Sequence, residues 1–175
     1  MGLLALLAAV LVGASGGALS FATMSGESVS LRPGKPEPAV VLHFWATWCP
    51  TCVEEMEVLD TIAEHCGEAG VRMVAVNVGE STEEISEFAA RNGLGIEMLR
   101  DPRGKTWRKL SGQGLPLNVV WTPEERRVFV GPRSPDWWRE VLSPLGCETG
   151  DPQSDTSGLR QTQNEIVPGN ESGGT

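Results

Sequence analysis

Apolar residues follow two different periods along the first half of the chain, and these predict alternating strands and a helix. Ala39–Trp45 and Val71–Val78 are nearly continuous apolar runs, typical of strands buried on both faces of a sheet. Between them, apolar residues recur at spacings of three and four from Cys52 to Ala63, which predicts an amphipathic helix ending near Cys66.

The second half of the chain adds two helices, a hairpin and a last helix. Ser81-Thr-Glu-Glu84 is a capping box that begins a helix, and Asn92-Gly93 ends it. The elements predicted after it are a brief helix over 105–111, two antiparallel strands over 117–121 and 127–130, and a helix from Ser134 to Gly146.

This order of elements predicts an α/β fold, with a mixed sheet and helices on both faces. At 175 residues the chain has room for one domain of ordinary size, expected over 39–147. The segment 21–38, rich in Ser, Gly and Pro around 25–38, is expected to be a lead-in outside the fold. The polar, acidic segment 148–175 is expected to be a disordered tail.

The first 20 residues are interpreted as a signal peptide or a membrane anchor. The segment Leu3–Val12 is an unbroken apolar run and small residues follow it, so cleavage after Ala18 or after Ser20 is possible. The missing Lys or Arg before Leu3 departs from the signal-peptide pattern. A periplasmic or otherwise extracytoplasmic location is expected, with the protein either cleaved or tethered.

The formal net charge of −9 argues against nucleic acid as a partner, because a phosphate-binding protein needs a basic surface. A monomer is expected. The chain has four cysteines, and in an exported protein these are read as disulfide-forming.

The pair Cys49 and Cys52 carries the strongest candidate chemistry. Cys-x-x-Cys places two sulfurs one helical turn apart, where a disulfide can form and break with little backbone movement. The pair also lies where a predicted buried strand passes into a predicted helix. A helix N-terminus stabilises a thiolate, which is the reactive species.

The segment Phe44-Trp-Ala-Thr-Trp-Cys-Pro-Thr-Cys52 resembles the active site of the thioredoxin superfamily, particularly the exported TlpA/ResA-like reductases. The resemblance extends over about 39–146. It is supported by Cys52-Val-Glu-Glu-Met56, Asp101-Pro-Arg-Gly104 and Gly114-Leu-Pro116. It implies a thioredoxin-like three-layer sandwich and a protein disulfide reductase with no cofactor beyond the Cys49–Cys52 disulfide.

In the mechanism that the resemblance implies, Cys49 attacks a substrate disulfide and Cys52 resolves the mixed disulfide. Pro116 would be a cis-proline facing the disulfide, and the backbone of Leu115 would pair with the substrate. Trp48, Pro50 and Thr51 would border the substrate surface. The implied partners are disulfides of exported proteins, for example in cytochrome c maturation, and a membrane thiol reductant as electron donor.

His43 lies six residues before Cys49, where thioredoxins carry a buried acid. Because a His near pKa 6.5 can take a proton from a thiol at neutral pH, we interpret His43 as a base for Cys52. The alternative is a core His satisfied by hydrogen bonds. Pro50, which lacks an N–H, and the acidic Glu54 and Glu55 oppose the Cys49 thiolate, so a reductant is expected.

Cys66 and Cys147 follow the active-site helix and the last helix, and the ends of these two helices could meet. They are candidates for a structural disulfide, with two buried free thiols as the alternative.

Two other classes of function remain as alternatives. A metal-handling module would use Cys49, Cys52, His43 and Cys66, but structural zinc sites usually have two paired knuckles, so no metal is expected. A thioredoxin-like binding or chaperone module would make redox turnover incidental.

Overall fold

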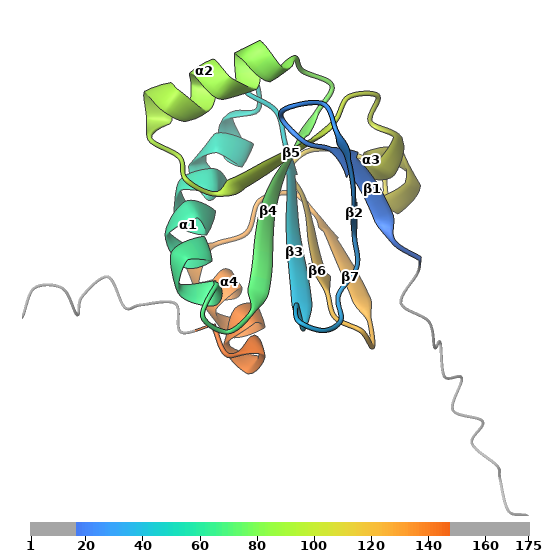
Figure 1. Cartoon of the computed structure of the whole chain (residues 1–175). Coiled ribbons are helices and arrows are strands. Elements are labelled where there is room, and N and C mark those ends of the chain that lie inside the picture. The colour runs from blue at the N-terminus through green and yellow to red at the C-terminus, as the bar shows by residue number, and fades with distance from the viewer. Residues whose placement is uncertain (1–16, 148–175) are drawn as a thin grey trace, which may run out of the picture.

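The computed structural model describes residues 17–147 (Figure 1). Residues 1–16 and the predicted tail 148–175 therefore lie outside the described residues. The strands are β1 (Leu19–Ala22), β2 (Ser28–Leu31), β3 (Ala39–Trp45), β4 (Val71–Val78), β5 (Glu97–Asp101), β6 (Leu117–Trp121) and β7 (Arg126–Val130). The helices are α1 (Pro50–Cys66), α2 (Thr82–Asn92), α3 (Lys105–Leu110) and α4 (Pro135–Leu142), followed by the 3-10 turn η1 (Ser143–Leu145).

A single mixed sheet forms the centre of the domain, with the strand order β2-β1-β5-β4-β3-β6-β7. β3 pairs in parallel with β4, and β4 pairs in parallel with β5. β6 pairs antiparallel with β3, and β7 antiparallel with β6, as the short connection between them requires.

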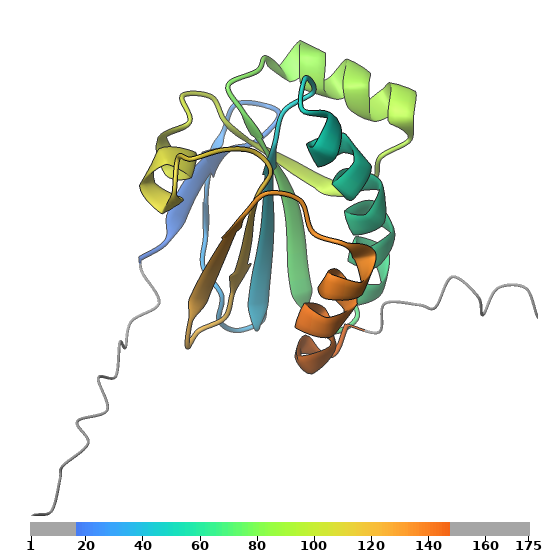
Figure 2. The same ribbon diagram turned by 180° about the vertical axis from the view of Figure 1, so that it is seen from behind.

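The helices lie on both faces of this sheet (Figures 1 and 2). One apolar core joins the inner faces of α1, α2 and α4 to the sheet, and the side chains of α3 pack against a second core on the opposite face. All seven residues of β3 are buried because this strand is covered on both sides. The thioredoxin-like α/β sandwich with helices on both faces is confirmed.

The fold begins earlier than the sequence pattern indicates. Part of the segment 21–38, interpreted as a lead-in outside the fold, forms with Leu19 and Ser20 the antiparallel hairpin β1–β2, and β1 pairs with β5. Leu19, Phe21 and Leu31 are buried in the core. The interpretation was wrong because each strand has only four residues, too few for an alternating period to stand out among Ser and Gly.

Local signals explain where the other elements begin and end. Ser81 accepts a hydrogen bond from the backbone of Glu84, whose side chain accepts from the backbone of Ser81, so the predicted capping box is present. Gly93 ends α2 in the left-handed conformation with φ 64°. Of the helices formed by residues 17–147, none is long and apolar enough to cross a bilayer.

Candidate redox site

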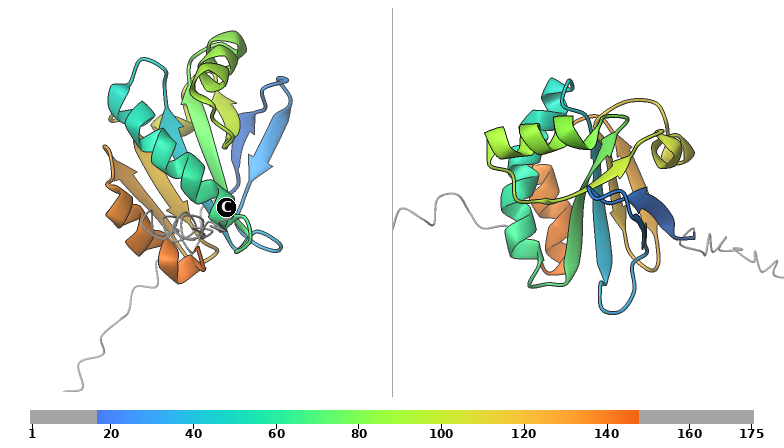
Figure 3. Two further views of the ribbon diagram at one scale, coloured as in Figure 1. Left: turned by 90° about the vertical axis from the view of Figure 1, so that its left-hand side faces the viewer. Right: turned by 45° about the horizontal axis from the view of Figure 1, so that its top comes forward.

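Cys49 and Cys52 form a disulfide at the point where β3 passes into α1, with the two Cα atoms 5.3 Å apart. Cys49 is the N-cap residue of α1 and is 6% exposed, whereas Cys52 in the first turn is fully buried. The carboxyl end of β3 and the beginning of α1 meet at one edge of the sheet (Figure 3). An incoming sulfur atom can therefore reach Cys49 more readily than Cys52.

The backbone around Cys49 favours a negative charge on its sulfur only in part. The carbonyl oxygen of Cys49 accepts hydrogen bonds from the backbone N–H groups of Cys52 and Val53, which begins the helix. Pro50 occupies the first helical position and has no N–H to donate to a thiolate. The hydroxyl of Thr51 lies 3.8 Å from the Cys49 sulfur.

The residues expected to border the substrate lie around this edge. Trp48 is 69% exposed beside Cys49, and Pro50 and Thr51 are also exposed. The Leu115–Pro116 peptide bond is cis. Leu115 is partly buried and packs against the apolar core that contains both cysteines. Trp48, Pro50 and Thr51 thus flank the disulfide in the sequence, and Leu115–Pro116 directly precede Leu117, which pairs with Phe44 near the end of β3. Contact of these residues with a substrate stays a prediction.

A half-buried acceptor, Glu80, holds the loop that carries Trp48. The carboxylate of Glu80 accepts hydrogen bonds from the backbone N–H of Thr47, at 2.8 Å, and from the Thr47 hydroxyl. It also accepts from the side-chain amide of Asn77 at the end of β4, at 2.5 Å. These contacts tie the segment before Cys49 to the neighbouring strand.

His43 lies under the site but contacts the backbone of Cys52. Its Nε2 atom is 3.3 Å from the Cys52 carbonyl oxygen, and its Nδ1 atom is 2.7 Å from Oδ1 of Asn118. Burial lowers the pKa of His43 to about 4, against the opposing effect of those two hydrogen bonds. The imidazole is therefore neutral at pH 7 and a weak base. Its role as the base for Cys52 stays a prediction.

Glu55, whose sequence position predicts only a negative charge opposing the Cys49 thiolate, is a buried titratable group of the site. It is 4% exposed, and its Oε1 atom accepts hydrogen bonds from the side-chain amide of Asn118 and the indole of Trp138, both at 2.8 Å. Residues three apart on a helix are neighbours, so Glu55 lies next to Cys52 on the buried face of α1. Its place within the apolar stripe of Cys52, Met56 and Leu59 was the signal that could have revealed it.

Burial raises the pKa of Glu55 to about 7, against smaller lowering effects of the Trp138 and Asn118 hydrogen bonds and of Arg133. The second oxygen, Oε2, is buried and lacks a hydrogen-bond partner within residues 17–147. A carboxyl group that titrates near neutral pH beside a thiol can both accept and return a proton.

The two shifted groups have opposite effects on stability. Between pH 4.5 and about 7, folded Glu55 holds a proton that the unfolded chain has released, so its contribution to stability falls as pH rises. Between about pH 4 and 6.5, unfolded His43 binds a proton that the folded protein does not, so its contribution rises. Glu55→Gln removes only the contribution to stability that falls as pH rises.

We therefore expect the difference in urea midpoint between Glu55→Gln and the wild type to grow in favour of the variant from pH 4.5 to 7. Urea unfolding followed at several pH values measures it, with Glu54→Gln on the exposed face of α1 as the control. A difference that stays constant over this range would contradict the raised pKa.

Cys66 and Cys147 form the second disulfide, with their Cα atoms 4.6 Å apart. It joins the last residue of α1 to the segment after η1, and both sulfurs are buried in the core. Cys66 thus lies at the opposite end of α1 from Cys49 and Cys52. Among the described side chains, no three or more His, Cys, Asp or Glu residues are grouped so that they could hold a metal ion.

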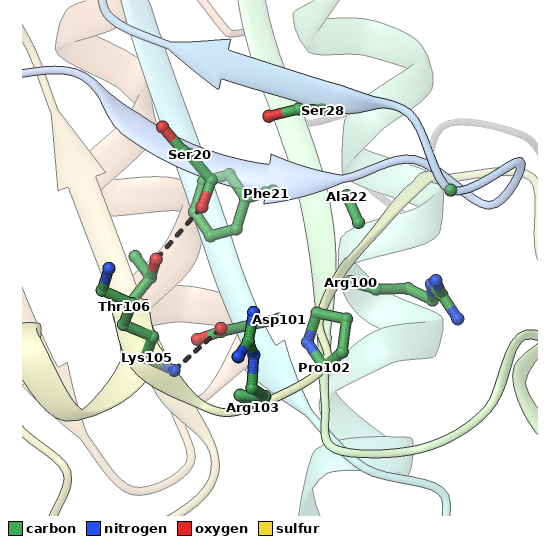
Figure 4. A pocket seen from close by; sticks show the side chains of 11 residues that line it. Ser20, Phe21, Ala22, Ser28, Arg100, Asp101, Pro102, Arg103, Lys105 and Thr106 are labelled. Carbon is green, nitrogen blue, oxygen red and sulfur yellow. Dashed lines mark hydrogen bonds between the residues drawn. The ribbon is translucent and has the colours of Figure 1, made fainter.

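A pocket of about 330 Å³ lies between β1, β5 and the beginning of α3 (Figure 4). Arg100, Arg103 and Lys105 contribute to its lining. The carboxylate of Asp101 accepts hydrogen bonds from the backbone N–H groups of Lys105 and Trp107. Neither Cys49 nor Cys52 lines this pocket, so we do not assign the pocket to the redox site.

Comparisons with known proteins agree with this geometry. The sequence matches the Redoxin family over residues 12–124. The thiol-disulfide oxidoreductase ResA of Bacillus subtilis is 32% identical over 106 residues, which cover 61% of this chain and 59% of ResA. The thiol:disulfide interchange protein DsbE of Tatumella citrea is 30% identical over 126 residues, which cover 66% of this chain and 60% of DsbE. The solved structure of MTB DsbF, in mixed oxidized and reduced forms, is similar with a TM-score of 0.63 and 26% identity over 73% of this chain and 94% of that chain. This chain thus spans less than two thirds of the length of either curated relative.

Proposed function

The chain belongs to the Redoxin family, and on that premise we propose that it is an extracytoplasmic thiol:disulfide oxidoreductase that reduces disulfides of exported proteins. The observation that carries the proposal is the Cys49–Cys52 disulfide at the N-terminus of α1, directly after the buried strand β3. The similarity to ResA, a thiol-disulfide oxidoreductase, and to DsbE, a thiol:disulfide interchange protein, supports it.

The reaction begins with the reduced pair. The Cys49 thiolate attacks one sulfur of a substrate disulfide, forms a mixed disulfide and releases the other substrate sulfur as a thiolate. Cys52 then loses its proton and attacks the Cys49 sulfur. This step forms the Cys49–Cys52 bond and releases the second substrate thiolate, so two electrons pass from the protein to the substrate. Cys49 makes the first attack because Cys52 is fully buried.

Glu55 takes the proton from Cys52 in this proposal. It lies one helical turn after Cys52 and titrates near pH 7, so its ionised form is available at neutral pH and its protonated form can return the proton. His43 is the weaker candidate because its lowered pKa makes it a poorer base and its Nε2 atom contacts the Cys52 carbonyl.

We expect Glu55→Gln to slow resolution of a Cys49 mixed disulfide by about 10² at pH 7, and to abolish the rise in that rate through pH 7. Stopped-flow release of a fluorescent thiol from the mixed disulfide measures the rate. Glu54→Gln, the exposed neighbouring acid, is the matched control and should leave the rate unchanged.

His43→Asn is the complementary variant. An unchanged resolution rate would exclude His43 as the base for Cys52. A slowed resolution rate in His43→Asn, together with a normal rate in Glu55→Gln, would reverse the assignment.

Export is supported by two features of the chain. The apolar run Leu3–Val12 has the length of a signal-peptide core, and the buried Cys66–Cys147 disulfide is typical of an oxidising compartment. A cut after Ala18 would leave β1 intact, whereas a cut after Ser20 would divide it. Terminal sequencing of the protein from the cell envelope tests this. A protein found only in the cytosol would contradict export.

The direction of electron flow follows from the groups around Cys49. Pro50 has no N–H to donate to the Cys49 thiolate, and the acidic Glu54 and Glu55 follow on the same helix. We therefore expect the thiolate to be less stabilised than in strongly oxidising relatives, and the protein to act as a reductant. A membrane thiol reductant would restore the dithiol. A Cys49 thiolate titration with a midpoint below about 5 would contradict this direction.

The substrate class is tested with defined peptides. We expect the reduced protein to open the disulfide of an oxidised Cys-x-x-Cys-His peptide, a model of the haem-attachment pair of an apocytochrome c. Chromatography of alkylated samples measures the reaction, with a Cys49→Ser variant as the control. Failure to reduce this peptide alongside reduction of unrelated disulfides would point to a general reductant.

A further inference from the structure

Three buried polar side chains from three elements form a hydrogen-bonded chain beneath the disulfide. His43 on β3 and Asn118 on β6 are directly paired in the sheet register. His43 Nδ1 is 2.7 Å from Asn118 Oδ1, and Asn118 Nδ2 donates to Glu55 Oε1 at 2.8 Å. The three side chains are 1%, 0% and 4% exposed, so water does not compete for these contacts.

The donors and acceptors of this chain do not match when Glu55 is ionised. With Oδ1 of Asn118 toward His43, Nδ1 of His43 must carry the proton. Nε2 then faces the Cys52 carbonyl oxygen, which can only accept. A neutral imidazole has one N–H, so one of these two contacts lacks a hydrogen. An imidazolium would satisfy both, but burial opposes it.

A fully matched arrangement exists when the Asn118 amide is turned over. Its Nδ2 then donates to His43 Nδ1, and His43 Nε2–H donates to the Cys52 carbonyl. Oδ1 of Asn118 now faces Oε1 of Glu55, so Glu55 must carry a proton and donate it. The Trp138 indole can still donate to the same oxygen, because a carboxylic hydroxyl oxygen keeps an acceptor lone pair.

We infer that His43 acts through Asn118 as a positioning residue that favours the protonated form of Glu55. When Glu55 loses its proton, the Asn118 amide turns over and the imidazole hydrogen moves from Nε2 to Nδ1. The imidazole keeps one hydrogen throughout, by exchange with solvent, and Glu55 releases one proton. The inference rests on the proposed function, since it assigns the control of the proton that Glu55 exchanges with Cys52.

This relay connects the state of Glu55 to the first turn of α1. While Glu55 is protonated, His43 Nε2–H is bonded to the Cys52 carbonyl; when Glu55 is ionised and ready to take the Cys52 proton, that bond is absent. The other groups facing Glu55 are Arg133 and the Trp138 indole from the α4 side, and the disulfide-bonded Cys52 on α1. In the oxidised protein neither cysteine of the site titrates, so Glu55 and His43 can be followed without interference.

The test is a nitrogen-15 NMR titration of the oxidised protein. The chain has two histidines, so the variant His65→Gln, which replaces an exposed residue, leaves His43 as the single imidazole. The carbon-13 carboxyl signal of Glu55 is assigned by its loss in Glu55→Gln. We expect His43 to change from the Nε2–H to the Nδ1–H tautomer at the midpoint of the Glu55 titration. A single tautomer throughout, or an imidazolium at neutral pH, would overturn the inference.

A second variant measures the size of the coupling. His43→Phe keeps a ring at this position but cannot bond to Asn118 or to the Cys52 carbonyl. Ionisation of Glu55 then no longer costs the hydrogen bond to Cys52, so the midpoint of the Glu55 titration should fall by about half to one pH unit, the equivalent of one neutral hydrogen bond. The same change at the exposed His65 should not move it. An unchanged or raised midpoint in a folded variant would overturn the relay. If His43→Phe does not fold, the tautomer titration decides. Neither readout requires turnover, so a protein that passes both and yet fails to exchange with dithiols would refute the proposed function alone.

Discussion

A Cys49→Ser variant is expected to reduce insulin disulfides, with dithiothreitol as electron donor, no faster than the uncatalysed reaction. Serine cannot form the mixed disulfide, and Cys52 is fully buried and cannot take over the first attack. Turbidity of the precipitating insulin chain measures the rate. Activity of this variant close to that of the wild type would remove Cys49 from the mechanism and favour a binding or chaperone module.

Cys52→Ala should fail in a different way. Cys49 still attacks, but no thiol resolves the product, so the mixed disulfide accumulates and mass spectrometry detects one substrate chain per protein. The double variant Cys66→Ala/Cys147→Ala, which leaves the site intact, is the control and should retain turnover at a temperature where it is folded.

Loss of the second disulfide should have the largest effect on stability. Cys66 and Cys147 are 81 residues apart in sequence, and closing a loop of this length restricts the unfolded chain. We expect Cys66→Ala/Cys147→Ala to lower the free energy of unfolding by about 4 to 5 kcal/mol in the chain-entropy description. Two buried sulfur atoms are also removed from the core, which adds to the loss.

Guanidinium unfolding of the oxidised proteins measures this difference. Cys49→Ala/Cys52→Ala is the matched control. The disulfide that it removes joins residues only three apart in sequence, so its loss of stability should be much smaller. Equal losses in the two double variants, or a loss below about 1 kcal/mol for the Cys66 and Cys147 pair, would contradict a stabilising role for the long loop.

The central part of the fold could be predicted because its patterns are long. β3 and β4 are continuous apolar strands, and the three-and-four spacing of α1 extends over several turns, so the strand-to-helix transition at Cys49 was recognisable. The resemblance of the Phe44–Cys52 segment added the three-layer arrangement. The hairpin β1–β2 was missed because its strands are short and its burial depends on pairing with β5, which is distant in sequence.

The candidate site was only partly predictable for a related reason. Cys49 and Cys52 carry their chemistry in their spacing, but the roles of Glu55 and Asn118 depend on contacts between separate elements. Glu is usually a surface residue, and the sequence does not reveal that Glu55 is buried. Burial raises its pKa, while the hydrogen bonds from Asn118 and Trp138 oppose that rise. His43 was identified from its position, yet its contacts with Asn118 and the Cys52 carbonyl required the β3–β6 register.

The most direct test of the account is redox equilibration of the purified protein against a series of dithiothreitol couples, followed by alkylation and mass spectrometry of the peptide that contains Cys49 and Cys52. We expect this peptide to change from fully alkylated to fully protected in one two-electron step, while the buried Cys66–Cys147 pair stays protected over the same range. A Cys49–Cys52 pair that remains closed, or one that remains open because it holds a metal ion, over the whole series would contradict the account.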